Sequence, residues 1–276
     1  MGDTTTAPLG QNDAVRFGAC RPPADATLAS EQGWAFLELP FGQLGLLDNP
    51  AGTSAVRHQL ESAGMRAESF HRFLPAPLRL VGDDLDLSAV ETYLQKALAR
   101  IAALGGHLAV FSGGKGRTIA DGYSRARAQE QFVSVLRRAG DIAAANGVTL
   151  VVEPLNQKET NFIVNVTEGA QVVRAAAHPA IRLMADLYHM VMEGEAFSVL
   201  EPVADILRHV HVADTERLAP GTGRYDYTGF FTTLHQIGYA GLVAAENTWR
   251  DFPAEGAPSV TFLREHWNVT NRAPHP

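Results

Sequence analysis

The sequence predicts an α/β protein built as a (β/α)8 TIM barrel, and three observations support this prediction. Short apolar and β-branched runs alternate with stretches of helical periodicity through most of the chain, which is the pattern of parallel strands joined by helices. Eight such runs are present, and eight strands are the number that closes this barrel. A length of 276 residues suits one domain, because such barrels have about 250 residues.

The eight runs are the expected strands, and they are rich in residues that favour strands. They cover residues 15–20, 35–41, 67–73, 107–113, 148–154, 181–188, 209–214 and 242–248. The barrel is expected to occupy residues 14–270 as a single domain. Residues 1–13 and 271–276 are polar and lack periodicity, which is typical of flexible tails.

Helices are expected in the intervals between these strands, and three of them have informative ends. The first, residues 24–32, is short, with barely two turns. Ser88 and Glu91 form a capping-box pair ahead of an apolar stripe, and Gly105 follows the end of that helix. A third helix is expected to end before the turn at residues 146–147.

Composition and charge exclude several classes of protein. A hydrophobic fraction of 46% and a charged fraction of 19% indicate a globular domain with a large core rather than a disordered chain. A net charge of −7 opposes general binding to nucleic acid. The single cysteine, Cys20, cannot form an internal disulfide, and no secretion signal or apolar run of about 20 residues is found. We therefore expect a cytoplasmic protein without nucleic-acid or membrane partners; a homodimer or homotetramer stays open.

Four expected strands in the second half of the chain end in residues that can coordinate a metal: Glu153, Asp186, His211 and Glu246. Each alone has a structural explanation, such as a buried partner for an arginine or a helix cap. Together they would meet at the mouth of the barrel, where three carboxylates repel each other unless a cation neutralises them. Three oxygen ligands and one imidazole favour Mn²⁺, Mg²⁺ or Co²⁺. His209, on the same strand as His211, is expected to point outward toward the helices.

The second half of the chain, residues 148–249, resembles the xylose-isomerase-like barrel superfamily of sugar phosphate isomerases and epimerases. The motifs that carry the resemblance are Glu-x-x-Asn from Glu153, Asp-x-x-His from Asp186, His-x-His from His209, and a strand-end glutamate at Glu246. Within the superfamily, the chain is most similar to ketose 3-epimerases of the tagatose and allulose type and to hydroxypyruvate-isomerase-like proteins. The Leu-Tyr pair after Asp186 differs from the Thr-Phe or Thr-Tyr usual in the epimerases, which leaves the substrate open.

The resemblance implies one divalent metal ion, with Mn²⁺ preferred over Mg²⁺ and Co²⁺, bound by the four strand-end residues. Glu153 and Glu246 are implied to be the catalytic bases. The substrate contacts that it implies are Glu159, His189, Arg217, Glu38 and His71. For His189 the alternative is a group that steadies a metal ligand.

The implied function is a divalent-metal-dependent sugar isomerase or epimerase, similar to a ketose 3-epimerase, that removes a proton beside a carbonyl through a metal-stabilised enediolate. A lyase or dehydratase acting on a keto-sugar or inosose would use the same base. A DNA-repair enzyme resembling endonuclease IV is a remote alternative, because it needs histidines at the third and fourth strand ends and a surface that suits DNA. A sugar-binding module without turnover would have no need for paired carboxylates.

The segment from Ser112 to Arg117 is glycine-rich and basic. Such a segment could cradle a phosphate or a carboxylate. It lacks the spacing of a P-loop, so a mobile surface loop is the favoured interpretation.

Overall fold

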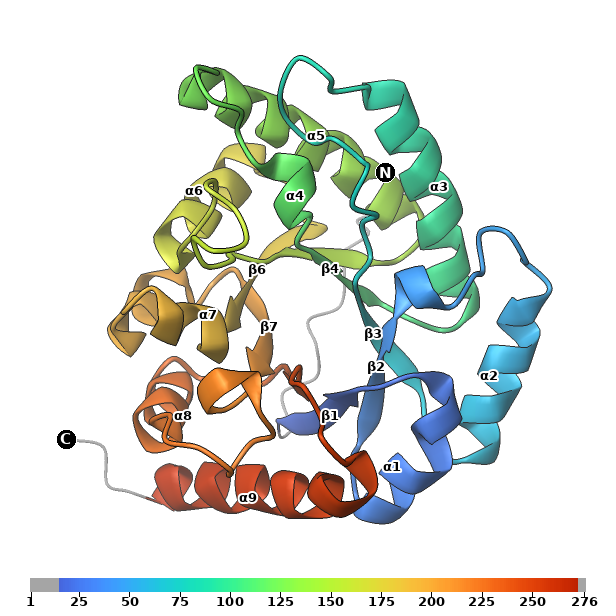
Figure 1. Ribbon diagram of the computed structural model, residues 1–276, viewed down its shortest axis with the longest axis vertical. Coiled ribbons are helices and arrows are strands. Elements are labelled where there is room, and N and C mark those ends of the chain that lie inside the picture. Colours follow the sequence, from blue (N-terminus) through green and yellow to red (C-terminus); the bar gives the residue numbers. More distant parts are fainter. Residues whose placement is uncertain (1–14, 273–276) are drawn as a thin grey trace, which may run out of the picture.

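The computed structural model describes residues 15–272, and its eight strands close into a parallel barrel in chain order (Figure 1). This confirms the predicted fold class and all eight predicted strands. The strands are β1 Arg16–Cys20, β2 Phe36–Pro40, β3 Ala67–His71, β4 Leu108–Phe111, β5 Thr149–Val152, β6 Ile181–Asp186, β7 Leu207–Val212 and β8 Leu242–Ala245.

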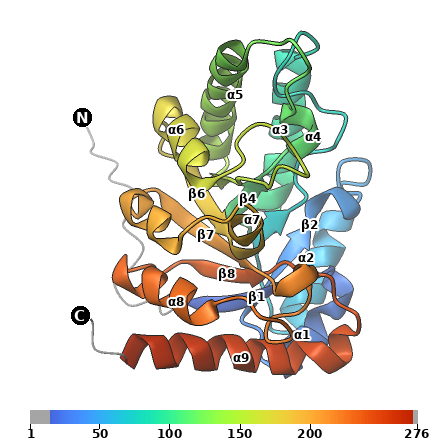
Figure 2. The ribbon, with the colours of Figure 1, turned by 60° about the vertical axis from the view of Figure 1, so that its left-hand side comes forward.

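Helices surround the strands on the outside, and the long helix α9 runs past the barrel beside α8 and α1 (Figures 1 and 2). The first helix, expected over residues 24–32, is a 3-10 turn followed by α1. The α-helices are α1 Ala26–Gln32, α2 Gly52–Ser62, α3 Leu87–Ala103, α4 Gly114–Arg117, α5 Arg125–Ala145, α6 Val166–Ala176, α7 Leu187–Met192, α8 Tyr227–Gln236 and α9 Phe252–Arg272. The 3-10 helices are η1 Pro23–Asp25, η2 Phe41–Gln43, η3 Phe197–Val203 and η4 Thr215–Arg217.

Side chains inside the barrel form layers, because alternate residues of each strand point inward. Two small apolar clusters on inward-facing positions are separate from the main core between strands and helices: Cys20, Phe36, Leu242 and Ala244, and Leu108, Val110, Val151 and Met184. Phe36 crosses toward β1, where a Cβ atom at Gly18 would lie 2.4 Å from its ring, so only glycine fits there. The apolar layers close the lower barrel and leave the polar inward positions near its carboxyl end.

The capping-box prediction for α3 is wrong in its cap residue. Asp86 is the N-cap, and its carboxylate accepts a hydrogen bond of 3.0 Å from the backbone N–H of Ala89. Ser88 lies one residue inside the helix, and Glu91 instead forms an ion pair with Arg138. A carboxylate one turn ahead of the apolar stripe takes the cap because it also suits the positive end of the helix dipole.

The ends of the domain differ slightly from the expected tails. The predicted N-terminal tail, residues 1–13, lies outside the described residues. At the other end α9 continues through Arg272, two residues into the expected C-terminal tail. Among residues 15–272, no helix combines the length and the apolar character needed to cross a membrane.

The cap assignment predicts different effects for two neighbouring substitutions. Asp86→Ala removes the acceptor for the Ala89 N–H and is expected to lower the free energy of unfolding by about 1 kcal/mol. Ser88→Ala should change the free energy of unfolding by only a few tenths of a kcal/mol. Urea denaturation of both variants measures the difference. A larger loss for Ser88→Ala than for Asp86→Ala would contradict the assignment.

Candidate metal and substrate site

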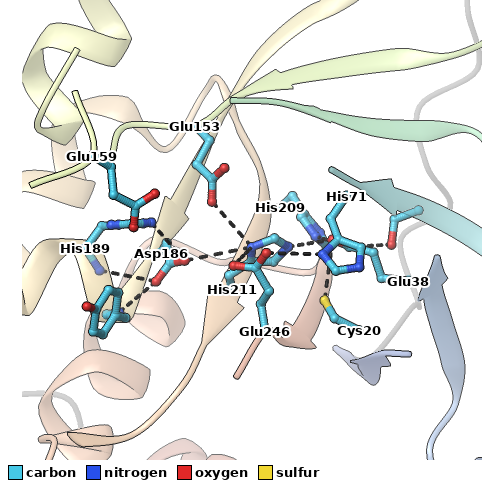
Figure 3. A network of polar contacts seen from close by, with 12 residues as sticks. Cys20, Glu38, His71, Glu153, Glu159, Asp186, His189, His209, His211 and Glu246 are labelled. Carbon is cyan, nitrogen blue, oxygen red and sulfur yellow. Dashed lines mark hydrogen bonds and ion pairs between the residues drawn. The ribbon is translucent and has the colours of Figure 1, made fainter. Parts of the chain in front are cut away.

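The four predicted metal ligands come together at the carboxyl end of the barrel. Glu153 and Glu246 directly follow β5 and β8, while Asp186 and His211 belong to β6 and β7. The Nδ1 atom of His211 lies 3.5 Å from Glu153 Oε1, 3.9 Å from Asp186 Oδ2 and 3.6 Å from Glu246 Oε2. Figure 3 shows the three carboxylates pointing toward the His211 ring. One ligand atom from each residue lies within 4.8 Å of the others.

The donor atoms of this cluster fit a divalent cation. Glu153 Oε1, Asp186 Oδ2 and His211 Nδ1 are buried without a hydrogen-bond partner in the described structure, an arrangement that is costly unless an ion satisfies them. Burial by itself lowers the pKa of His211, but the charge of Glu38 and the neighbouring carboxylates of Glu153 and Glu246 outweigh burial and raise this pKa well above its ordinary value. The cluster therefore favours a positive charge at Nδ1, where a cation would bind.

Glu38 holds the His211 ring from below. Its Oε1 lies 2.7 Å from His211 Nε2, and its Oε2 lies 2.7 Å from His209 Nε2 and accepts a 2.6 Å hydrogen bond from Ser69. An Nε2–H donated to a carboxylate leaves Nδ1 as the atom that could bind a metal. Glu38 is 0% exposed, so the structure places this expected substrate contact beneath the metal ligands.

The predicted outward orientation of His209 is wrong. His209 is fully buried and meets the same Glu38 carboxylate as His211. Residues two apart on a strand point to the same side of the sheet, so His209 follows His211 into the barrel. Figure 3 shows both rings on the Glu38 side of the cluster.

Asp186 combines the two roles that the sequence left open. Its Oδ1 caps α7 by accepting hydrogen bonds from the backbone N–H groups of Tyr188 and His189, while Oδ2 faces the metal cluster. The His189 ring lies behind it, with Nε2 3.8 Å from Asp186 Oδ2 and Nδ1 accepting from the Asn156 backbone N–H at 3.1 Å. His189 is 3% exposed, which suits a group that steadies a ligand.

Glu246 is held by two further side chains. Arg217 donates to its Oε2, and His71 Nδ1 lies 3.1 Å from its Oε1. Burial raises the pKa of Glu246, but its hydrogen bonds to His211 and His71 and the charge of Arg217 hold the pKa well below its ordinary value. Arg217 has a left-handed φ of 60°, and its carbonyl accepts a 2.7 Å hydrogen bond from the Thr248 N–H.

A cavity of about 660 Å³ opens above the cluster, a size within the usual range for small-molecule sites. Five of the predicted site residues line it: Glu153, Glu246, Glu159, Arg217 and His71. Asp186, His211, His189 and Glu38 are not among its lining residues. Two lining residues that the sequence analysis missed are Cys20 and Asn247, whose amide atoms are buried without a hydrogen-bond partner in the described part of the chain. Their places at the ends of β8 and β1 were the available signal.

The interpretation of residues 112–117 as a mobile surface loop is wrong. The segment contains α4, and the guanidinium of Arg117 is fully buried. It donates to the carbonyls of Glu153 at 2.7 Å, Phe162 at 3.0 Å and Ile163 at 3.1 Å, and also to that of Ser112. Burial lowers the pKa of Arg117 to about 10. Arg117 thus ties the ends of β4 and β5 together and holds the backbone of Glu153.

Comparison with known proteins shows which family this barrel resembles. Residues 26–266 match the family model described as Xylose isomerase-like TIM barrel. An L-ribulose 3-epimerase of Methylomonas sp. (strain DH-1) is 36% identical over 117 residues, which cover 42% of this chain and 41% of that protein. A putative hydroxypyruvate isomerase of Mus musculus is 28% identical over 151 residues, 52% of each chain. These relatives confirm the predicted resemblance, and the chain spans about half the length of the curated relatives it matches.

A solved structure agrees over a larger part of the chain. The D-psicose 3-epimerase from Clostridium cellulolyticum H10, crystallised with D-tagatose, superposes with a TM-score of 0.82 over 92% of this chain and 99% of that chain. The sequence identity is 20%, so this likeness establishes the fold alone.

The contacts of Glu38 predict an effect on metal affinity. Glu38→Gln replaces one acceptor oxygen beside the two histidines with an amide donor and is expected to weaken Mn²⁺ binding by about 10- to 100-fold. Isothermal titration calorimetry measures the affinity. Glu68→Gln is the matched control, because Glu68 is a buried carboxylate of β3 that pairs with Arg16 outside the site. Equal affinities in the two variants would argue against the role of Glu38.

The ligand set predicts one divalent ion per chain and a stabilised fold. Because a metal that binds only the native state shifts the folding equilibrium, a hundredfold excess over Kd should add about 2.7 kcal/mol. The melting temperature is expected to rise with Mn²⁺ after chelator treatment, and His211→Ala should lose most of this rise. If His211→Ala keeps the full shift and the full metal stoichiometry, the assigned ligands are wrong.

Proposed function

Because the chain belongs to the xylose isomerase-like TIM barrel family, we propose that it is a divalent-metal-dependent sugar epimerase or isomerase, with ketose 3-epimerisation as the reaction that its site supports best. The observation that carries this proposal is that two of the four candidate metal ligands line the cavity and the other two do not. Only Glu153 and Glu246 both join the metal cluster and line the cavity. They follow β5 and β8, two strands that are not neighbours in the barrel.

Two carboxylates that face one substrate from separate strands suit inversion at a carbon beside a carbonyl. One glutamate removes the proton from one face of that carbon, and the other, in its protonated form, returns a proton to the opposite face. A bound cation, for which we propose Mn²⁺ with Mg²⁺ and Co²⁺ as alternatives, would act as a Lewis acid at the substrate carbonyl. Solvent exchange resets the two carboxyl groups for the next turnover.

The neighbouring side chains would bind and orient the substrate. Arg217, which already contacts Glu246 and Glu159, offers positive charge to the enediolate that proton removal leaves. The Nε2 atom of His71 has no hydrogen-bond partner among residues 15–272, and His71 lines the cavity. His71, Glu159 and Asn247 would therefore hold hydroxyl groups near the reacting carbon.

Two alternatives use the same barrel. A lyase would remove the same proton and expel a hydroxyl from the next carbon, so its product would lack one water. The DNA-repair alternative lacks support at the fourth strand, because β4 ends at Phe111 and Ser112 follows it, where a histidine would be needed. The cytoplasmic location and the oligomeric state stay predictions.

Proton exchange tests the proposal. Ketoses incubated with the Mn²⁺-loaded protein in D₂O should gain deuterium at one carbon, identified by NMR, and form the epimer. Glu246→Gln is expected to lower net epimerisation by at least 10²-fold, while one-sided exchange through Glu153 can persist.

Metal content measured on the same samples separates a lost base from a lost ion. Glu68→Gln again serves as the control that leaves both glutamates in place. Near-normal epimerisation by metal-loaded Glu153→Gln and Glu246→Gln would contradict the two-base reaction, and a product lighter by one water would favour the lyase.

A further inference from the structure

The cavity carries positive charge that the proposed reaction does not use. Five arginine or lysine residues line it, against the three glutamates Glu153, Glu159 and Glu246. Arg217 pairs with Glu159 and Glu246, and Arg21 pairs with Asp25. The remaining cations are Arg72, Lys115 and Lys158.

These three cations have no acidic partner among residues 15–272, since the charged group of none of them takes part in an ion pair or a hydrogen bond there. All three are exposed at the cavity mouth. The chain as a whole has a net charge of −7 and contains three lysines. Two of those lysines therefore line one cavity in a protein whose overall charge is negative.

The unpaired cations lie on one side of the barrel mouth. Arg72 follows β3, Lys115 belongs to α4 after β4, and Lys158 follows β5, and these strands are consecutive in the barrel. The four candidate metal ligands lie at the ends of β5 to β8, so the two groups share only the end of β5. A substrate in the cavity would thus have its reacting carbons at one side and a cationic wall at the other.

The backbone that carries Arg72 and Lys115 is held in place by hydrogen bonds. Arg79 donates a 2.8 Å hydrogen bond to the Lys115 carbonyl, and the Leu80 N–H donates to the Gly116 carbonyl at 2.8 Å. Arg72 has a left-handed φ of 48°, a costly conformation for a residue with a side chain, and its carbonyl accepts from the Gly42 N–H. These hydrogen bonds therefore fix the backbone of α4 at Lys115.

We propose that the substrate carries an anionic group, a phosphate or a carboxylate, which Arg72, Lys115 and Lys158 bind while the reacting carbons lie between Glu153 and Glu246. The inference rests on the proposed function for the position of the reacting carbons. Unpaired cations beside a cavity attract and orient such a group. A neutral sugar would leave them without a partner.

Binding of matched probes to the Mn²⁺-loaded protein tests the inference. Calorimetry compares D-fructose with D-fructose 6-phosphate and with D-fructuronate, which carries a carboxylate at the same C6 position, at low salt, and either anion is expected to bind roughly tenfold or more tightly than the neutral sugar. The preference should shrink in 1 M salt, where charges are screened beyond about 3 Å. The anion that binds more tightly shows whether the site prefers a phosphate or a carboxylate.

Two sets of variants locate the binding charge. Lys115→Gln with Lys158→Gln should lower the ratio of anionic to neutral affinity by about four- to tenfold, and adding Arg72→Gln should bring it close to one. Lys96→Gln is the control, because Lys96 is the third lysine and is exposed on α3, away from the cavity. Equal affinity of the wild-type protein for all probes, or a ratio that Lys96→Gln lowers as much, would overturn the inference.

The two proposals fail in different ways. A neutral ketose that exchanges deuterium and binds as tightly as the anions removes the anionic substrate and leaves the epimerase intact. A strong preference for anions without deuterium exchange in any probe removes the epimerase and leaves the anion-binding wall.

Discussion

Buried negative charge at the carboxyl end of the barrel is the constraint on which the rest of the site depends. Three carboxylates surround Nδ1 of His211 within 3.9 Å, and in a low-dielectric interior such a group is stable only with compensating positive charge. Glu38 adds a fourth carboxylate from below and fixes the ring that the others face. The barrel supplies this closeness because the ends of its parallel strands meet at one mouth.

Around this centre, the structure separates residues that lie below the cavity from residues that reach it. Asp186 caps α7, and His211 pairs with Glu38. Neither of the two residues lines the cavity. Glu153 and Glu246 reach the cavity, but their supports differ: Arg117 holds the Glu153 backbone, while Arg217 and His71 hold the Glu246 carboxylate. The buried Arg117 thus positions the backbone of Glu153, and the half-buried Arg217 places its positive charge beside the carboxylate of Glu246.

Some of the errors made from the sequence have local causes. Asp86 and Ser88 are both good cap residues, and only the start of α3 in the structure selects Asp86. The basic segment ending at Arg117 has the composition of an exposed loop, yet its guanidinium meets carbonyls from Phe162 and Ile163. Contacts between segments so distant in sequence do not produce a periodic pattern in either segment, so the sequence alone does not reveal them.

The sequence by itself determined the barrel, its eight strands and the four strand-end residues that meet at its mouth, because strand alternation and strand-end position are local patterns that parallel closure brings together. The tertiary structure alone decided that Glu38 serves His209 and His211 beneath the site, that His189 stands behind Asp186, and that the unpaired cations gather on the β3–β5 side. These roles depend on the depth of each side chain in the barrel and on its neighbours from other strands, which are set by the register of the closed sheet.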